Sequence, residues 1–194
     1  QAGARVAILL NLFFGLVAGI ALGLASLWGA LQLSMTNVAV GAWVANPETG
    51  SIDADPYTRL RVAITGLLAL NSSETVYYEA MTDEEGERLS GLCTYRLEGA
   101  DPAARWWSVT VYGADNFLLP GSNGVFSVTR NNVVRDAHGS FTITLAKDAT
   151  GPNAIPTGDG AFNLTLRLYN PDPGIAADLT TARLPRIIKT GCVS

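Results

Sequence analysis

The chain of 194 residues has room for one domain of ordinary size and a membrane anchor, but two soluble domains would be too many. Hydrophobic residues make up 48% of the sequence and charged residues 15%, and the apolar excess is concentrated at the N-terminus. The formal net charge is −4, and no cluster of Lys and Arg is present to bind phosphates, which argues against nucleic acid as a partner.

The N-terminal segment predicts a transmembrane helix over residues 1–33, with a short cytoplasmic start. No charged residue lies between Val6 and Leu33. About 20 apolar residues cross a hydrocarbon core of roughly 30 Å, so this segment crosses the bilayer once with length to spare. The alternative is a secretory signal peptide, whose apolar region is about 7–15 residues long and is removed from the mature protein. The longer run, still present in the chain, favours an anchor.

The basic residues nearest this span predict its orientation. Arg5 directly precedes the apolar run, and the next basic residue is Arg59, well beyond it. The positive-inside rule then places the N-terminus in the cytoplasm. We expect the rest of the chain to face the periplasm or the outside.

Three glycines inside the span predict a helix-packing site. Gly15, Gly19 and Gly23 are four residues apart, so they lie on one stripe of a helix. Small residues at this spacing let two helix backbones approach closely within lipid, where there is little hydrophobic gain from pairing. We expect contact with other transmembrane helices of a larger complex, or with copies of this chain. The alternative is that glycine is simply common in membrane helices.

The segment that follows the span is read as a linker. Residues 34–58 mix Gly, Pro, Asn and Asp with isolated apolar residues. Residues 59–71 are apolar over a length that fits a short helix or a strand equally well. A single β domain is expected over residues 59–194.

Period-two patterns dominate that domain. The clearest is at 162–170, where Phe162, Leu164, Leu166 and Leu168 alternate with polar residues. Other strands are predicted at 75–82, 92–99, 105–113, 124–130 and 140–146, separated by Gly, Pro and Asn turns. A brief helical turn within 172–182 and an extended piece at 183–192 end the chain. The fold class is mainly β, an antiparallel jelly-roll-like sandwich with one N-terminal transmembrane helix.

The two cysteines predict a disulfide. Cys93 falls in a predicted strand and Cys192 near the end of the chain. A pair of cysteines in a domain expected outside the cytoplasm indicates a bond, although two unrelated buried thiols are the alternative. The bond would fasten the C-terminal tail to the sheet.

Candidate catalytic groups are few. His138 is the only histidine and sits in a predicted hairpin turn, so neither a His/Cys metal cluster nor a serine triad is expected. Asp53 and Asp55 fall in the linker, and a further acidic group falls at a hairpin tip, where charges are usually just solvated. That group is Asp83, Glu84, Glu85 and Glu87. We therefore expect no enzymatic activity, no metal and no cofactor.

An aromatic cluster offers a candidate binding surface. Trp106, Trp107 and Tyr112 lie on one predicted strand, whose alternation divides them between the two faces of a sheet. One face must be core. The other is a candidate surface for a sugar, a lipid headgroup or a protein, or it is covered by the linker or a second sheet.

Three sequence blocks resemble a known family. The blocks are "ARWWSVTVYGADNFLLP" at 104–120, "DAHGSFTITLA" at 136–146 and "GAFNLTLRLYNPDP" at 160–173. In this order they resemble the uncharacterised bacterial family called domain of unknown function 1214, over about residues 90–175. The "DADPYTRLRVAITG" segment resembles the lead-in of its short, membrane-anchored members. The resemblance implies a jelly-roll-like β fold and no established activity. Together with the apolar span and Arg5, a bacterial source would place the chain in the inner membrane, with the N-terminus in the cytoplasm and the C-terminal domain in the periplasm.

Three functions remain open at this stage. The favoured one is a non-catalytic, membrane-anchored accessory or structural subunit of an inner-membrane complex, with the β domain on the periplasmic side. The second is an anchored domain that binds a small ligand such as a carbohydrate or a lipid headgroup. The third, a hydrolase, is disfavoured by the lack of a catalytic motif.

Overall fold

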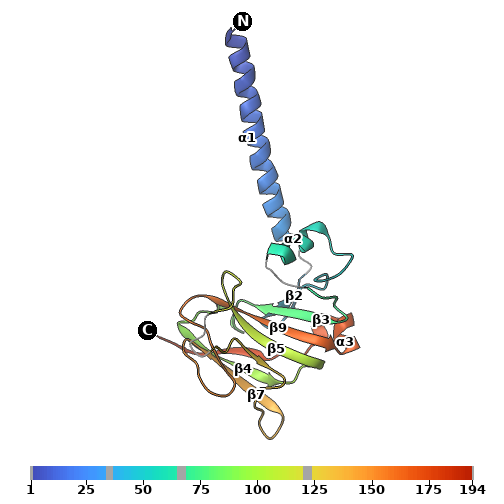
Figure 1. The fold of residues 1–194 in the computed structure, drawn as a ribbon, viewed down its shortest axis with the longest axis vertical. Helices are drawn as coiled ribbons and strands as arrows, with labels where there is room; N and C mark the ends of the chain where they lie inside the picture. The colour runs from blue at the N-terminus through green and yellow to red at the C-terminus, as the bar shows by residue number, and fades with distance from the viewer. Residues whose placement is uncertain (1, 34–36, 65–68, 120–123, 194) are drawn as a thin grey trace.

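A long apolar helix stands on a β domain in the computed structural model (Figure 1), which describes residues 2–33, 37–64, 69–119 and 124–193. The helix, α1 (Ala2–Leu33), is 32 residues long, or about 48 Å at 1.5 Å per residue. Its segment Arg5–Gly29 has a mean hydropathy of 2.4 and no buried residue. This segment is long and apolar enough to cross a bilayer, and it contributes nothing to the protein core.

Ten strands and three further short helices are seen in the described part of the chain. In chain order they are β1 (Val38–Val40), β2 (Trp43–Ala45), α2 (Pro56–Ile64), β3 (Thr75–Ala80), β4 (Cys93–Ala100), β5 (Ala104–Gly113), β6 (Ser127–Thr129), β7 (Ser140–Ala146), β8 (Ala154–Pro156), β9 (Phe162–Pro171), α3 (Pro173–Ala177), the 3₁₀ helix η1 (Leu179–Thr181) and β10 (Arg186–Cys192). The mainly β fold expected from the sequence is therefore observed.

The strands form two sheets. The six-stranded sheet has the order β1-β2-β3-β9-β5-β6, and the four-stranded sheet has the order β10-β4-β7-β8. Neighbouring strands are antiparallel except β7 and β8, which are parallel, so the expectation of a wholly antiparallel sandwich is corrected. After β7 the chain reverses twice within residues 147–153, where Gly151 and Asn153 adopt positive φ.

The core lies between the two sheets. β9 is central in the larger sheet, and its Leu164, Leu166 and Leu168 are fully buried, as its alternation predicts. The ring of Trp107 on β5 stacks on Phe141 of β7 with a centroid distance of 5.0 Å, which joins the two layers. Side chains from both sheets belong to one hydrophobic cluster, so the domain has a single core.

The predicted linker over 34–58 requires correction. Residues within it form the hairpin β1–β2, which extends the larger sheet beyond β3. Trp43 is 1% exposed, and its indole Nε1 donates to the carbonyl of Pro185 at 2.7 Å. Strands of three residues are too short to show a period in the sequence, which explains why the composition alone indicated a linker. The β domain thus begins before residue 59.

The C-terminal segment is bonded into the smaller sheet. β10 pairs with β4 along its length, and Cys192 lies opposite Cys93 in the register. A disulfide joins these two cysteines. The helical turn expected within 172–182 is present as α3 and η1.

Candidate functional site

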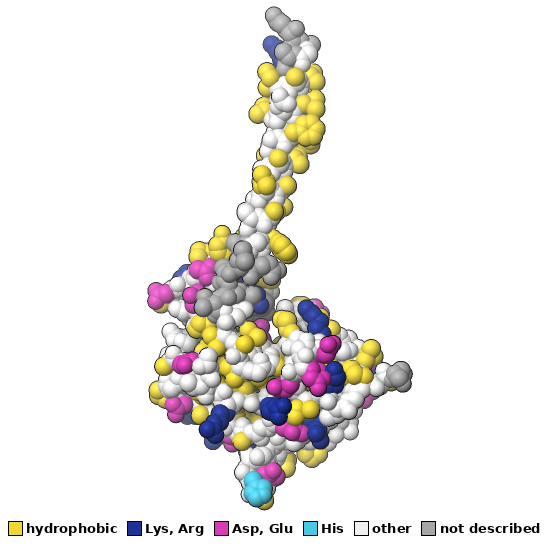
Figure 2. Space-filling model, turned by 180° about the vertical axis from the view of Figure 1, so that it is seen from behind, with side chains coloured by type: hydrophobic (Ala, Val, Ile, Leu, Met, Phe, Trp, Pro, Cys, Tyr) yellow, Lys and Arg dark blue, Asp and Glu magenta, His cyan; other side chains and the backbone are white. Residues whose placement is uncertain are grey.

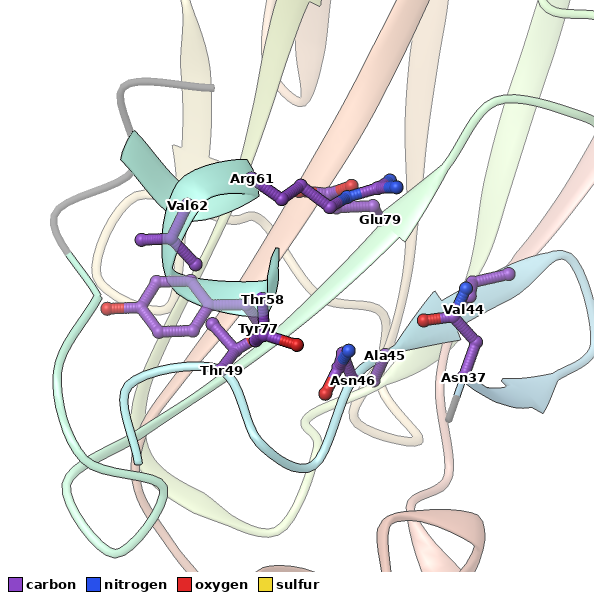
Figure 3. A pocket seen from close by; sticks show the side chains of 10 residues that line it. All are labelled: Asn37, Val44, Ala45, Asn46, Thr49, Thr58, Arg61, Val62, Tyr77 and Glu79. Carbon is purple, nitrogen blue, oxygen red and sulfur yellow. The ribbon is translucent and has the colours of Figure 1, made fainter. Parts of the chain in front are cut away.

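A small pocket lies between α2 and the face of β2 and β3 that α2 covers (Figure 3). It is lined by Asn37, Val44, Ala45, Asn46, Thr49, Thr58, Arg61, Val62, Tyr77 and Glu79. Its volume is about 60 Å³, which holds a few water molecules. Ligand pockets for drug-sized molecules are about 300–1,000 Å³, so this pocket is too small for a sugar.

The local sequence explains why α2 starts where it does. The carboxylate of Asp55 accepts hydrogen bonds from the backbone N–H of Tyr57 at 2.8 Å and from the hydroxyl of Thr58 at 2.6 Å. Pro56 follows as the first helical residue, which is the position where proline is best tolerated. The hydrogen bond from Thr58 is the main cause that lowers the pKa of Asp55, and bonds from the Tyr57 and Thr58 backbones add to it. Asp55 therefore acts as a helix cap, and residues 56–64 are helical rather than a strand.

The inner side of α2 carries both polar and apolar side chains. Thr58 is buried, and Arg61 and Val62 are half-buried against β3. Figure 3 shows Arg61 of α2 lying alongside Glu79 of β3, and the ring of Tyr77 below Val62. The Tyr77 hydroxyl accepts a hydrogen bond from the backbone N–H of Leu70 at 3.1 Å. These contacts fix α2 on the sheet at the base of α1.

The predicted aromatic surface is divided by the alternation of β5. Trp106 and Tyr112 are half-buried on the outer face, and the Trp106 ring meets Tyr169 edge-on at 5.1 Å. Trp107 points into the core instead, is fully buried, and donates from Nε1 to Asp101 at 2.8 Å. Trp107 is therefore excluded from any binding surface.

Arg167 is a member of the outer face that the sequence did not single out. Its guanidinium lies 5.5 Å from the centroid of the Tyr112 ring and donates to the Tyr112 hydroxyl at 2.9 Å. A second, longer contact reaches Thr110 Oγ1 at 3.4 Å. Among the described residues no carboxylate forms an ion pair with Arg167. The face thus combines a cation, hydroxyls and aromatic rings, a chemistry that suits a hydroxylated or anionic ligand.

The acidic hairpin tip is partly structural, which corrects the expectation that it is solvated. Asp83 is buried, and its Oδ1 accepts backbone hydrogen bonds from Glu85 and Glu87, both at 3.0 Å. Lys189 of β10 lies 3.5 Å from the other oxygen of Asp83. This carboxylate therefore holds the turn and its contact with β10.

His138 lies in an exposed turn, as predicted, and its backbone N–H donates to Asp136 at 2.8 Å. Figure 2 shows the only histidine at the end of the domain farthest from α1. Within the ranges that the structure describes, no three His, Cys, Asp or Glu side chains are grouped to hold a metal ion.

The three helix glycines face open space. A Cβ placed on Gly15, Gly19 or Gly23 would meet no atom within 4 Å. Nothing else in the described chain uses the groove that these residues leave.

Comparisons with known proteins identify a family but no activity. The family model described as protein of unknown function (DUF1214) matches residues 74–173. The VPA0106 protein from Vibrio parahaemolyticus is similar in structure, with a TM-score of 0.59 and 25% identity over 73% of this chain. The match covers 36% of that protein, so this chain spans about a third of its length. An uncharacterised Burkholderia cenocepacia protein gives a TM-score of 0.41 at 15% identity, covering 87% of this chain and 49% of its own. No curated protein matches.

Proposed function

The chain belongs to the DUF1214 family, whose function is unknown, and we propose that this member is a non-catalytic, membrane-anchored accessory or structural subunit of a protein complex. In this proposal α1 spans the bacterial inner membrane and packs against other transmembrane helices. The β domain, which we propose to be jelly-roll-like, lies on the periplasmic side.

The observation that carries the proposal is the complete exposure of α1. Its large apolar side chains from Val6 to Trp28 are exposed, and Figure 2 shows one side of the helix standing clear of the β domain. Lipid can cover such side chains, but lipid gains nothing from the open groove at Gly15, Gly19 and Gly23. A second helix gains close van der Waals contact there.

Two features support the periplasmic placement. Arg5 precedes the span, which favours a cytoplasmic N-terminus. The disulfide between Cys93 and Cys192 suits an oxidising compartment such as the periplasm, because cytosolic thiols are kept reduced.

Substitutions on two opposite sides of α1 test the subunit proposal. Leucine at Gly15, Gly19 and Gly23 fills the groove, and the triple variant should insert and fold but lose its partner during purification in mild detergent. Val17→Phe with Leu24→Phe adds bulk on the opposite side of α1 and should leave the complex intact. Undiminished co-purification of the triple variant contradicts the proposal.

The outer face around Arg167 favours a second function, an anchored domain that binds a small hydroxylated or anionic ligand. Aromatic rings at Trp106 and Tyr112 would stack on a sugar or headgroup, and Arg167 would bind an anionic substituent. Calorimetric titration with anionic oligosaccharides and with glycerophosphate tests this function. Binding that is lost in the Trp106→Ala variant supports this function. If neither ligand class gives a heat of binding, this function is rejected.

A further inference from the structure

The helix α2 leaves three large apolar side chains exposed on the side that faces away from the sheet. Surface helices turn their apolar stripe toward the core and their polar face toward water. Here the side of α2 that faces the sheet carries the buried Thr58 and the half-buried Arg61, with Val62 as its one large apolar residue. The outward side carries Tyr57 and Leu60, each 38% exposed, and Ile64, 69% exposed.

These outward residues form one continuous stripe. Positions three and four apart are neighbours on a helix surface, so Tyr57, Leu60 and Ile64 follow each other along one side of α2. No charged residue interrupts this stripe within α2. We call Tyr57, Leu60 and Ile64 the α2 apolar face.

A groove runs beside the same helix. It has a volume of about 320 Å³, and its apolar lining includes Ile52, Ala54, Val62 and Ala69. The side chain of Arg59 is tied down along it, because its Nε donates to the carbonyl of Ala54 at 2.9 Å. Because Val62 lies on the side of α2 opposite Leu60 and Ile64, this groove is separate from the α2 apolar face.

The position of α2 relative to α1 decides which partner covers this surface. α2 contacts α1, and Figure 1 shows it at the end of α1 that meets the domain. The apolar span ends at Gly29 and the helix continues to Leu33, a further rise of about 6 Å. The polar interface on each side of a hydrocarbon core is about 5–8 Å thick. With α1 in the bilayer, α2 therefore lies at the depth of the headgroups.

We propose that α2 is an interfacial helix that lies on the bilayer, with the α2 apolar face turned toward the lipid. The proposal rests on the anchoring of α1, which is part of the proposed function. Helices of this kind bury their apolar side about 5–10 Å into the boundary between headgroups and acyl chains. Contact with lipid on α2 as well as α1 would fix the β domain at one angle to the membrane.

Fluorescent labels in the full chain test this proposal. Ile64→Cys, Leu16→Cys and Val134→Cys are each labelled with an NBD dye and reconstituted into phosphatidylcholine–phosphatidylglycerol vesicles that carry a nitroxide quencher near the headgroup or deep in the acyl chain. Leu16 reports on the middle of α1. Val134 is a matched apolar control, 58% exposed, between β6 and β7. The native cysteines are joined in a disulfide and do not react.

We expect the Ile64 label to lose fluorescence mainly to the shallow quencher, the Leu16 label mainly to the deep one, and the Val134 label to neither. Leu60→Glu added to Ile64→Cys should reduce the loss to that of Val134. If the Leu16 label is quenched and the Ile64 label is not, the interfacial role of α2 is wrong while the anchor stands. A blue-shifted but unquenched Ile64 label would mean that a second copy covers the face, which also overturns the proposal. An unquenched Leu16 label would refute the anchor itself.

Discussion

Replacing Trp43 with alanine should destabilise the β domain strongly, although the sequence placed this residue in a linker. Its side chain is almost completely buried in the core cluster. Loss of a buried Trp or Phe side chain typically costs about 3–5 kcal/mol. The variant also removes the donor to the Pro185 carbonyl, a contact of 2.7 Å. Because domains are stable by only about 5–15 kcal/mol, this loss is a large share of the total.

Two further variants separate the contributions. Trp43→Phe keeps most of the ring and loses the hydrogen bond, so we expect a smaller loss of about 1–3 kcal/mol for the unsatisfied buried carbonyl. Val44→Ala changes the next residue of β2, which points to the opposite, exposed side. Its cost should stay below about 1 kcal/mol.

Pulse proteolysis of the full chain in mild detergent, over a series of urea concentrations, measures these differences without using tryptophan fluorescence. The midpoint of unfolding should fall most for Trp43→Ala, less for Trp43→Phe and least for Val44→Ala. If Trp43→Ala unfolds at the same urea concentration as Val44→Ala, then β2 is not part of the core and residues 34–58 are a linker after all.

Three other outcomes follow from the same structure. Replacing both Cys93 and Cys192 with alanine should lower the free energy of unfolding by up to about 5 kcal/mol, because the disulfide joins residues 99 positions apart. The urea midpoint of unfolding measures this loss, and an unchanged midpoint would show that the bond is absent. Asp101→Ala should cost about 1–3 kcal/mol because it orphans the buried Nε1 of Trp107, and Trp107→Phe in that background should cost less than it does alone. Burial raises the pKa of Asp101, but hydrogen bonds from Arg135 and Trp107 outweigh it, and the pKa is lowered overall. The stabilisation by Asp101 is therefore complete at neutral pH and is lost as the pH falls below about 4. The loss in free energy of unfolding caused by Asp101→Ala should then become smaller in acid. If Asp101 were unpaired, this loss would not depend on pH.

The sequence by itself determined the features that depend on local pattern. An uninterrupted run rich in leucine and alanine gives the long helix α1, because these residues have high helix propensity. Strict alternation at 162–170 determines which side of β9 is buried, since successive side chains of a strand point to opposite faces. The same rule places Trp106 and Trp107 on different faces, and the blocks around them identify the family.

Tertiary structure decided what depends on partners distant in the chain. β1 and β2 are strands only because β3 offers a free edge for pairing, and Trp43 is buried only because the segment around Pro185 packs over it. The parallel pairing of β7 with β8 likewise depends on how residues 147–153 turn back.

For the candidate sites, too, the sequence showed some features and the tertiary structure decided others. The sequence placed Asp55 in the linker and left residues 59–71 open between helix and strand, and the hydrogen bonds to Asp55 show that α2 begins there. The outward direction of Leu60 and Ile64 depends on which side of α2 faces the sheet. Arg167 meets Tyr112 only through the pairing of β5 with β9, which joins residues 55 positions apart. Local patterns in the sequence specify which residues avoid water. The order of strands in a sheet is set by pairing between segments far apart in the chain, and only that pairing brings side chains such as Arg167 and Tyr112 together.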